Sequence, residues 1–223
     1  MSYGQNDTIT GGVERVYNTS FHKLLRMFTL SILVSFIGTY VGMEFVPVEW
    51  IIPLVIVEFI MLISAFFIRR SKGRSVGYLF VYAFCFISGI TIFPSVMHYA
   101  NVGGSGLIST AFIVTTVIFG GLTLYAYYSK RDFTFLGGFL MVGLLTLIGF
   151  SLVGMFIGGF GSTLGLMIAI GGVLIFSGFI LYDISQYRHG LADEAIPMAV
   201  LSLYLSFINL FLYILRLLGF SRD

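Results

Sequence analysis

Seven long apolar stretches, separated by short polar or glycine-containing segments, constrain the fold of this chain most strongly. A membrane-crossing helix needs about 20 predominantly apolar residues, and each stretch is about that long. The predicted spans are residues 24–46, 51–68, 77–97, 107–128, 133–157, 164–187 and 196–218. The chain is 58% hydrophobic and only 10% charged, whereas a soluble domain is about 25% charged. The sequence therefore predicts an all-α membrane protein built as a seven-transmembrane-helix bundle.

The distribution of positive charge predicts how the bundle is oriented. Ten of the twelve Lys and Arg residues lie in one set of alternating loops, and the other two are Arg216 and Arg222. Because cytoplasmic loops carry an excess of Lys and Arg, we expect a cytoplasmic N-terminus and a C-terminus outside. That orientation requires an odd number of crossings. The expected organisation is a polar N-terminal segment 1–22, a transmembrane domain 23–219 and a short tail 220–223.

Several classes of function are disfavoured by the sequence. A net charge of +2 without a basic patch argues against nucleic-acid binding. Retinal binding requires a lysine inside a span, and this chain has none there. Intramembrane proteolysis by paired aspartates requires a second intramembrane aspartate beside Asp183, and the sequence has none. Residues 103–106 match the G-x-S-G letters of a serine protease, but they lie in a short loop and predict a turn. We therefore expect no enzyme, no resident cofactor and no internal disulfide for the single Cys85.

Two acidic residues, Glu58 and Asp183, lie inside apolar spans. A charge at the centre of a membrane helix costs about 2.5–3.5 kcal/mol on insertion scales. Each of these carboxylates is therefore expected to have an ion-pair partner or a functional role. Glu58 precedes Arg69 by eleven residues, or roughly 16 Å of helix, which places it at the level of Arg216. Asp183 lies near the cytoplasmic end of its span, at the level of Arg69. Depth therefore predicts two ion pairs, Glu58 with Arg216 and Asp183 with Arg69.

The same residues also admit other interpretations. Both ion pairs can be purely structural helix contacts, while Asp183, close to the surface, can also titrate or bind a cation. Carboxylate oxygens suit Ca²⁺, which makes Asp183 and Glu58 candidates for weak contacts with that ion, although no defined metal site is predicted. Asn209 lies deep in the last span and is expected to form an interhelical hydrogen bond. The three histidines, at span edges or in loops, are expected to be solvated or interfacial.

Three segments carry a family resemblance. They are residues 201–212 (LSLYLSFINLFL), 181–183 (LYD) and 84–91 (FCFISGIT). Together they resemble the Bax inhibitor family of membrane proteins, most closely its bacterial calcium-leak members, over roughly residues 20–220. The resemblance implies a bundle in which a central seventh helix is wrapped by six others. It also implies a pH-sensitive calcium leak down the ion's gradient.

The family's functional residues map onto this chain with one departure. The resemblance implies a sensor of two aspartates latched by an arginine, and it assigns the first aspartate to Asp183 and the latch to Arg69. It assigns an outer ion pair to Glu58 and Arg216. Where the family usually has the second aspartate, this chain has Ser206. A hydroxyl cannot repel Asp183 as a second carboxylate would, so we expect a weaker or acid-shifted pH response.

Two functions from different classes follow. The first choice, implied by the resemblance, is a pH-modulated calcium leak channel in a bacterial plasma membrane, with Ca²⁺ as the transported ion and the lipid bilayer as its surroundings. The alternative is a non-transporting regulator that binds another membrane protein, such as a membrane-bound AAA protease. Ser206 in place of the usual aspartate keeps this alternative open, because a cation-attracting carboxylate is missing.

Overall fold

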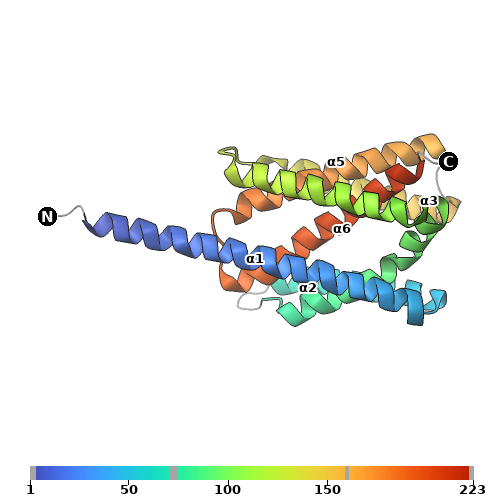
Figure 1. The fold of residues 1–223 in the computed structure, drawn as a ribbon, viewed down its shortest axis with the longest axis horizontal. Helices are drawn as coiled ribbons and strands as arrows, with labels where there is room; N and C mark the ends of the chain where they lie inside the picture. Colours follow the sequence, from blue (N-terminus) through green and yellow to red (C-terminus); the bar gives the residue numbers. More distant parts are fainter. Residues whose placement is uncertain (1–3, 71–74, 159–160, 221–223) are drawn as a thin grey trace. The chain divides into compact units, whose positions relative to one another are not determined.

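A computed structural model describes residues 4–70, 75–158 and 161–220, without the side chains of 4–19, Phe66, Arg69, Arg70, Met155 and Ser162. Its long helices are α1 (Gly4–Phe45), α2 (Ile51–Arg70), α3 (Tyr78–Tyr128), α4 (Gly137–Ile157), α5 (Ser162–Tyr187) and α6 (Ile196–Phe220). Figure 1 shows their order along the chain. Short 3-10 turns are η1 (Val48–Trp50), η2 (Thr134–Leu136) and η3 (Asp193–Ala195). No strand occurs in the described ranges, and the prediction of an all-α membrane protein is confirmed.

The number of apolar helices differs from the number of predicted spans. Among the described residues, six helices are long and apolar enough to cross a membrane. The difference lies in α3, whose 51 residues would extend about 76 Å as one straight helix. The predicted spans 77–97 and 107–128 fall on either side of Gly104, where φ is 72° and ψ is 177°. Such a positive φ is accessible mainly to glycine, so Gly104 interrupts the helix where the sequence predicts a turn.

Glycines also end helices at two other predicted breaks. Gly158 follows α4 with φ 76°, and its backbone N–H donates to the carbonyl of Gly154. Gly190, three residues after α5, has φ 95°. Left-handed glycines are a common way to satisfy the last carbonyls of a helix, so the local sequence explains where α4 and α5 stop.

The chain divides into two compact units. Unit 1 comprises residues 1–93 and 186–204, and unit 2 comprises residues 94–185 and 205–223. Both α3 and α6 contribute one part to each unit. The two units are described separately below.

Unit 1 is organised by a close crossing of α1 and α3. A Cβ atom added to Gly38 would overlap the backbone of Phe86, and one added to Gly89 would overlap the backbone of Ser35. One turn after Gly38, a Cβ on Gly42 would lie 2.8 Å from Cδ1 of Phe93. Glycine therefore allows the two backbones to approach directly, as expected of small residues at membrane helix contacts.

A buried polar cluster lies beside this crossing. Tyr204 of α6 is fully buried, and its hydroxyl oxygen lies 2.8 Å from Oγ of Ser35. The Phe84 ring packs edge-on against the Tyr204 ring, with 6.2 Å between centroids. Cys85 is buried with a free thiol. The hydrogen bond between two helices satisfies polar groups that would otherwise be costly to bury.

The core of unit 2 is largely aromatic. The ring of Phe112 on α3 contacts Phe207 and Phe211 of α6, at centroid distances of 6.0 and 6.3 Å. Phe119 of α3 contacts Phe207 at 5.4 Å. In the most apolar window of α6, 61% of residues are buried, against 39% for α5 and less for the other apolar helices. α6 is thus the most enclosed of the described apolar helices.

Candidate functional site

Glu58 lies in unit 1, on α2, and its carboxylate accepts a hydrogen bond from an uncharged side chain. The hydroxyl of Thr91 on α3 donates to Oε2 of Glu58 at 2.7 Å. The same hydroxyl also lies 3.0 Å from the carbonyl oxygen of Ser88, and its single proton can serve only one acceptor at a time. A carboxylate is the stronger acceptor, so the bond to Glu58 is favoured when that group is ionised. The sequence marked residues 84–91 as a motif but did not link Thr91 to Glu58.

Asp183 and Ser206 both lie in unit 2 and both are buried. Asp183 on α5 is only 4% exposed, and Ser206 on α6 is also 4% exposed. Asp183 precedes the last residue of α5 by four positions, or about 6 Å. Although it lies near a helix end, as the sequence predicts, packing shields its carboxylate. The structure therefore places an acid and a hydroxyl in the enclosed part of unit 2.

The two predicted ion pairs stay predictions. The side chain of Arg69, at the end of α2, lies outside the described residues, so its predicted contact with Asp183 has no described geometry. Glu58 belongs to unit 1 and Arg216 to unit 2, and the units are described separately.

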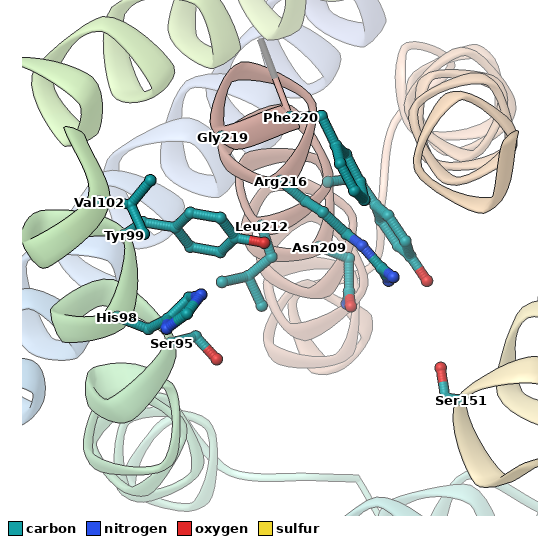
Figure 2. Close-up of a pocket in the computed structure, with 11 residues that line it drawn as sticks. Ser95, His98, Tyr99, Val102, Ser151, Asn209, Leu212, Arg216, Gly219 and Phe220 are labelled. Carbon is teal, nitrogen blue, oxygen red and sulfur yellow. The ribbon is translucent and has the colours of Figure 1, made fainter. Parts of the chain in front are cut away.

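Arg216 and Asn209, two residues singled out from the sequence, line the same cavity in unit 2. The cavity has a volume of about 550 Å³ and is walled by parts of α3, α4 and α6. Its polar walls include Ser95 and His98 from α3 and Ser151 from α4. Figure 2 shows the Arg216 and Asn209 side chains extending from α6 toward the side on which Ser151 lies. The sequence predicted His98 at a span edge and gave no signal of this cavity.

The environments of Arg216 and Asn209 are largely set by α6 itself. The Arg216 guanidinium lies over the ring of Phe220, with Cζ 5.7 Å from the ring centroid, within the range of a cation–π contact. The Asn209 amide donates to the carbonyl of Leu205 at 2.8 Å. This bond stays within one helix, where an interhelical bond was predicted, because the side-chain amide reaches the carbonyl one turn back in its own helix.

Two further observations concern charge. In unit 1, Nζ of Lys23 lies 3.1 Å from Oδ1 of Asp193, which joins α1 to η3 through an exposed ion pair. The pairing links residues far apart in the chain, so the sequence alone does not indicate it. Within the described part of the chain, no three His, Cys, Asp or Glu side chains gather closely enough to hold a metal ion.

Comparison with known proteins identifies the family. The family described as "Inhibitor of apoptosis-promoting Bax1" matches residues 17–223. The chain belongs to the Bax inhibitor family.

Relatives of this Bax inhibitor family chain include bacterial and viral proteins. It is 33% identical over 204 residues to an uncharacterized protein of Helicobacter pylori, covering 89% of this chain and 85% of the relative. It is 31% identical over 222 residues to an uncharacterized membrane protein of Vibrio cholerae, covering 97% and 96%. It is 41% identical over 116 residues to the Golgi anti-apoptotic protein of vaccinia virus strain Lister, covering 52% and 48%. The resemblance seen in the sequence is confirmed.

Proposed function

We propose that this Bax inhibitor family protein is a pH-modulated calcium leak channel in the plasma membrane. The observation that carries the proposal is the buried carboxylate of Asp183, 4% exposed on the apolar helix α5. An acid at that place costs free energy, and carboxylate oxygens are suitable ligands for Ca²⁺. Passive flux down a gradient requires only weak, reversible contacts. The proposed activity needs no catalysis and no resident cofactor.

We place seven crossings in the membrane, with α3 contributing two. Gly104 interrupts α3, and each part would be long enough for one crossing of a hydrocarbon core about 30 Å thick. The N-terminus is cytoplasmic and the C-terminus outside in this arrangement, as the Lys and Arg distribution favours. α6 would then be the central seventh helix, and its high burial supports that assignment.

In the proposed mechanism, Asp183 and Arg69 form the cytoplasmic gate and Ser206 modifies it. A close pair of carboxylates would raise one pKa and allow switching near neutral pH. With Ser206 that repulsion is absent, so Asp183 stays ionised and paired with Arg69 to lower pH. The calcium flux should then respond to pH more weakly or at a more acidic pH. Glu58 and Arg216 form the outer ion pair along the ion pathway. Asn209 is a secondary polar group there.

Calcium flux into dye-loaded proteoliposomes tests the proposal. The purified full-length chain is compared with Asp183→Asn, and Asp132→Asn serves as a matched control because Asp132 lies in the segment between α3 and η2. We expect calcium entry for the unchanged chain and the control, and an altered entry rate for Asp183→Asn. Folded, inserted protein that gives no flux in any variant would overturn the channel.

A second candidate is a non-transporting regulator that binds a membrane-protein partner. Two points favour it: Ser206 stands where the resemblance implies a cation-attracting carboxylate, and one viral relative is named an anti-apoptotic protein. A membrane-bound AAA protease is the kind of partner that the resemblance implies. A regulator would co-purify with its partner in stoichiometric amounts and give no flux in liposomes, whereas a channel conducts when purified alone.

A further inference from the structure

Thr91, the last residue of the motif at 84–91, contacts a carboxylate. Its hydroxyl oxygen lies 2.7 Å from Oε2 of Glu58 on α2 and 3.0 Å from the carbonyl oxygen of Ser88 on its own helix. All three residues belong to unit 1. The Glu58 and Thr91 side chains are half-buried, and Ser88 is buried. The motif thus supplies a hydroxyl to the acidic residue of an apolar helix.

The two acceptors give the Thr91 hydroxyl two hydrogen-bonding arrangements. The group has one proton and two lone pairs. When the proton points to Glu58, Thr91 donates to the carboxylate. When the proton points to the Ser88 carbonyl, Thr91 keeps a hydrogen bond within its own helix, as threonine commonly does, and its oxygen turns its lone pairs toward Glu58. The hydroxyl proton is therefore bonded in either arrangement.

In the second arrangement, two oxygens can bind one cation. Oε2 of Glu58 and Oγ1 of Thr91 are 2.7 Å apart, and Ca²⁺ binds oxygen ligands at roughly 2.3–2.6 Å, so that an ion beside them reaches both. The Ser88 side chain also interacts with the Glu58 carboxylate, which brings a further hydroxyl oxygen to this carboxylate. One carboxylate with neutral oxygens makes a weak site, and weak binding suits an ion that has to leave again.

The turn of α3 that carries Thr91 can also adjust. Pro94 lies inside α3, three residues after Thr91, and it has no N–H to donate to the carbonyl of Ile90. The helix therefore lacks one of its hydrogen bonds next to Thr91, and a proline is a common place for a membrane helix to bend. A small shift of the Thr91 oxygen toward an ion is less restricted here than in a regular helix.

We propose that the Thr91 hydroxyl is an oxygen ligand for a divalent cation held at Glu58, and that it releases its hydrogen bond to the carboxylate when the ion binds. The inference rests on the proposed function, in which calcium passes Glu58, and adds Thr91 to that pathway. A cation at Glu58 competes with the Arg216 guanidinium, the ion-pair partner proposed above, because the same carboxylate attracts both. Binding is therefore brief, and the Thr91 oxygen offsets part of the lost ion pair.

Infrared difference spectra with and without Ca²⁺ test the site without requiring transport. The full-length chain carries isotope-labelled glutamate and is reconstituted in lipid at a fixed alkaline pH. The carboxylate band of Glu58 is identified by its absence from Glu58→Gln. Because a carboxylate stretching band shifts when the group binds a cation, we expect a saturable, calcium-dependent shift of this band in the unchanged chain. If calcium leaves the Glu58 band unchanged, the proposal is wrong.

Variants at Thr91 assign the ligand. Thr91→Val keeps the shape but removes the oxygen, and the calcium concentration that gives half of the band shift should rise about fivefold. Thr91→Ser retains a hydroxyl and should bind calcium as the unchanged chain does. Thr116→Val is the matched control, because that hydroxyl is exposed and bonds only within its own helix. Equal calcium affinity in Thr91→Val and the unchanged chain would overturn the proposal, and Thr91→Ala carries the same test if Thr91→Val does not fold.

Calcium entry into proteoliposomes separates this inference from the proposed channel. If no calcium enters while the Glu58 band still shifts in a Thr91-dependent way, the cation site stands and the channel is wrong. If calcium enters, and the concentration for half-maximal entry is the same in Thr91→Val and the unchanged chain, the channel stands and the role given to Thr91 is wrong.

Discussion

Glycine has opposite roles in the two units. In unit 1, Gly38 and Gly89 face the backbone of a crossing helix, so that α1 and α3 touch directly. In unit 2, Gly172 and Gly219 face aromatic rings, those of Tyr213 and Tyr99, which line the cavity. The same residue type therefore fixes a helix crossing in one unit and makes room for cavity-lining side chains in the other.

The two units differ in whether the atoms that face the glycine can move away from an added methyl group. A backbone atom in a packed helix cannot move away from an added methyl group without shifting the whole element, whereas a ring can rotate or tilt. We therefore expect unit 1 to be intolerant of change at its glycines and unit 2 to adapt. A cavity that accepts a ligand or passes an ion benefits from adaptable walls, while the crossing in unit 1 supplies a fixed frame.

The largest effect is expected from Gly89→Ala. The added methyl group would overlap the backbone of Ser35, and we expect a loss of about 3 kcal/mol or more in unfolding free energy. Gly120→Ala is the control, because nothing lies within 4 Å of a Cβ there and alanine favours a helix by about 1 kcal/mol. Thermal unfolding in mild detergent measures both. If Gly89→Ala and Gly120→Ala unfolded at the same temperature, the backbone contact at Gly89 would not be rigid and the proposed difference between the units would be wrong.

Gly172→Ala should have an intermediate effect. The new methyl group would lie 2.5 Å from Cγ, Cδ1 and Cδ2 of Tyr213, so the whole ring must move aside, at a cost of about 1–3 kcal/mol. The neighbouring Gly171→Ala is a matched control, since its Cβ has no close neighbour. The prediction is checked in the same unfolding assay. A loss as large as that of Gly89→Ala would show that unit 2 is as rigid as unit 1.

Thr91→Val measures how much the hydrogen bond from Thr91 to Glu58 adds to the unfolding free energy of unit 1, in comparison with the glycine contacts of the α1–α3 crossing. Valine keeps the shape but removes the donor, and measured bonds between membrane helices average about 0.6 kcal/mol with a maximum of about 1.7. We expect a loss within that range. Thr116→Val is the control, because the Thr116 hydroxyl is exposed and bonds only the carbonyl of Phe112 in its own helix. A loss for Thr91→Val that does not exceed the control would contradict a role for this bond.

The smallest effect is expected from Lys23→Gln. The ion pair with Asp193 is exposed, at 36% and 74% of the two side chains, and exposed pairs contribute little to stability. We expect no measurable change in the unfolding temperature at moderate salt. A clear drop that high salt abolishes would show that this contact stabilises unit 1.

The sequence predicted the elements better than their contacts. Apolar runs located the helices, and Gly104, Gly158 and Gly190 lie at predicted breaks, because positive φ is a local property of glycine. The sequence also predicted the break in α3, where the non-helical backbone of Gly104 separates the spans expected at 77–97 and 107–128. The crossing of α1 and α3 at Gly38 and Gly89 depends on how two helices pack in space.

The site was only partly predictable for a physical reason. Depth in the membrane can be counted from helix rise, so Glu58, Asp183 and Arg216 were found from the sequence. The direction in which a side chain points around its helix depends on tertiary packing. The hydroxyl of Thr91 beside Glu58 and the cavity beside Arg216 therefore appeared only in three dimensions.

The decisive experiment measures calcium entry into proteoliposomes from acidic to alkaline pH, for the unchanged chain and for Ser206→Asp. If Asp183 and the residue at 206 together set the pH response of a calcium leak, calcium enters with a shallow or acid-shifted pH dependence for the unchanged chain and with a steeper one for Ser206→Asp. A steep two-proton response near neutrality in the unchanged chain, or no flux in either protein, would overturn this mechanism.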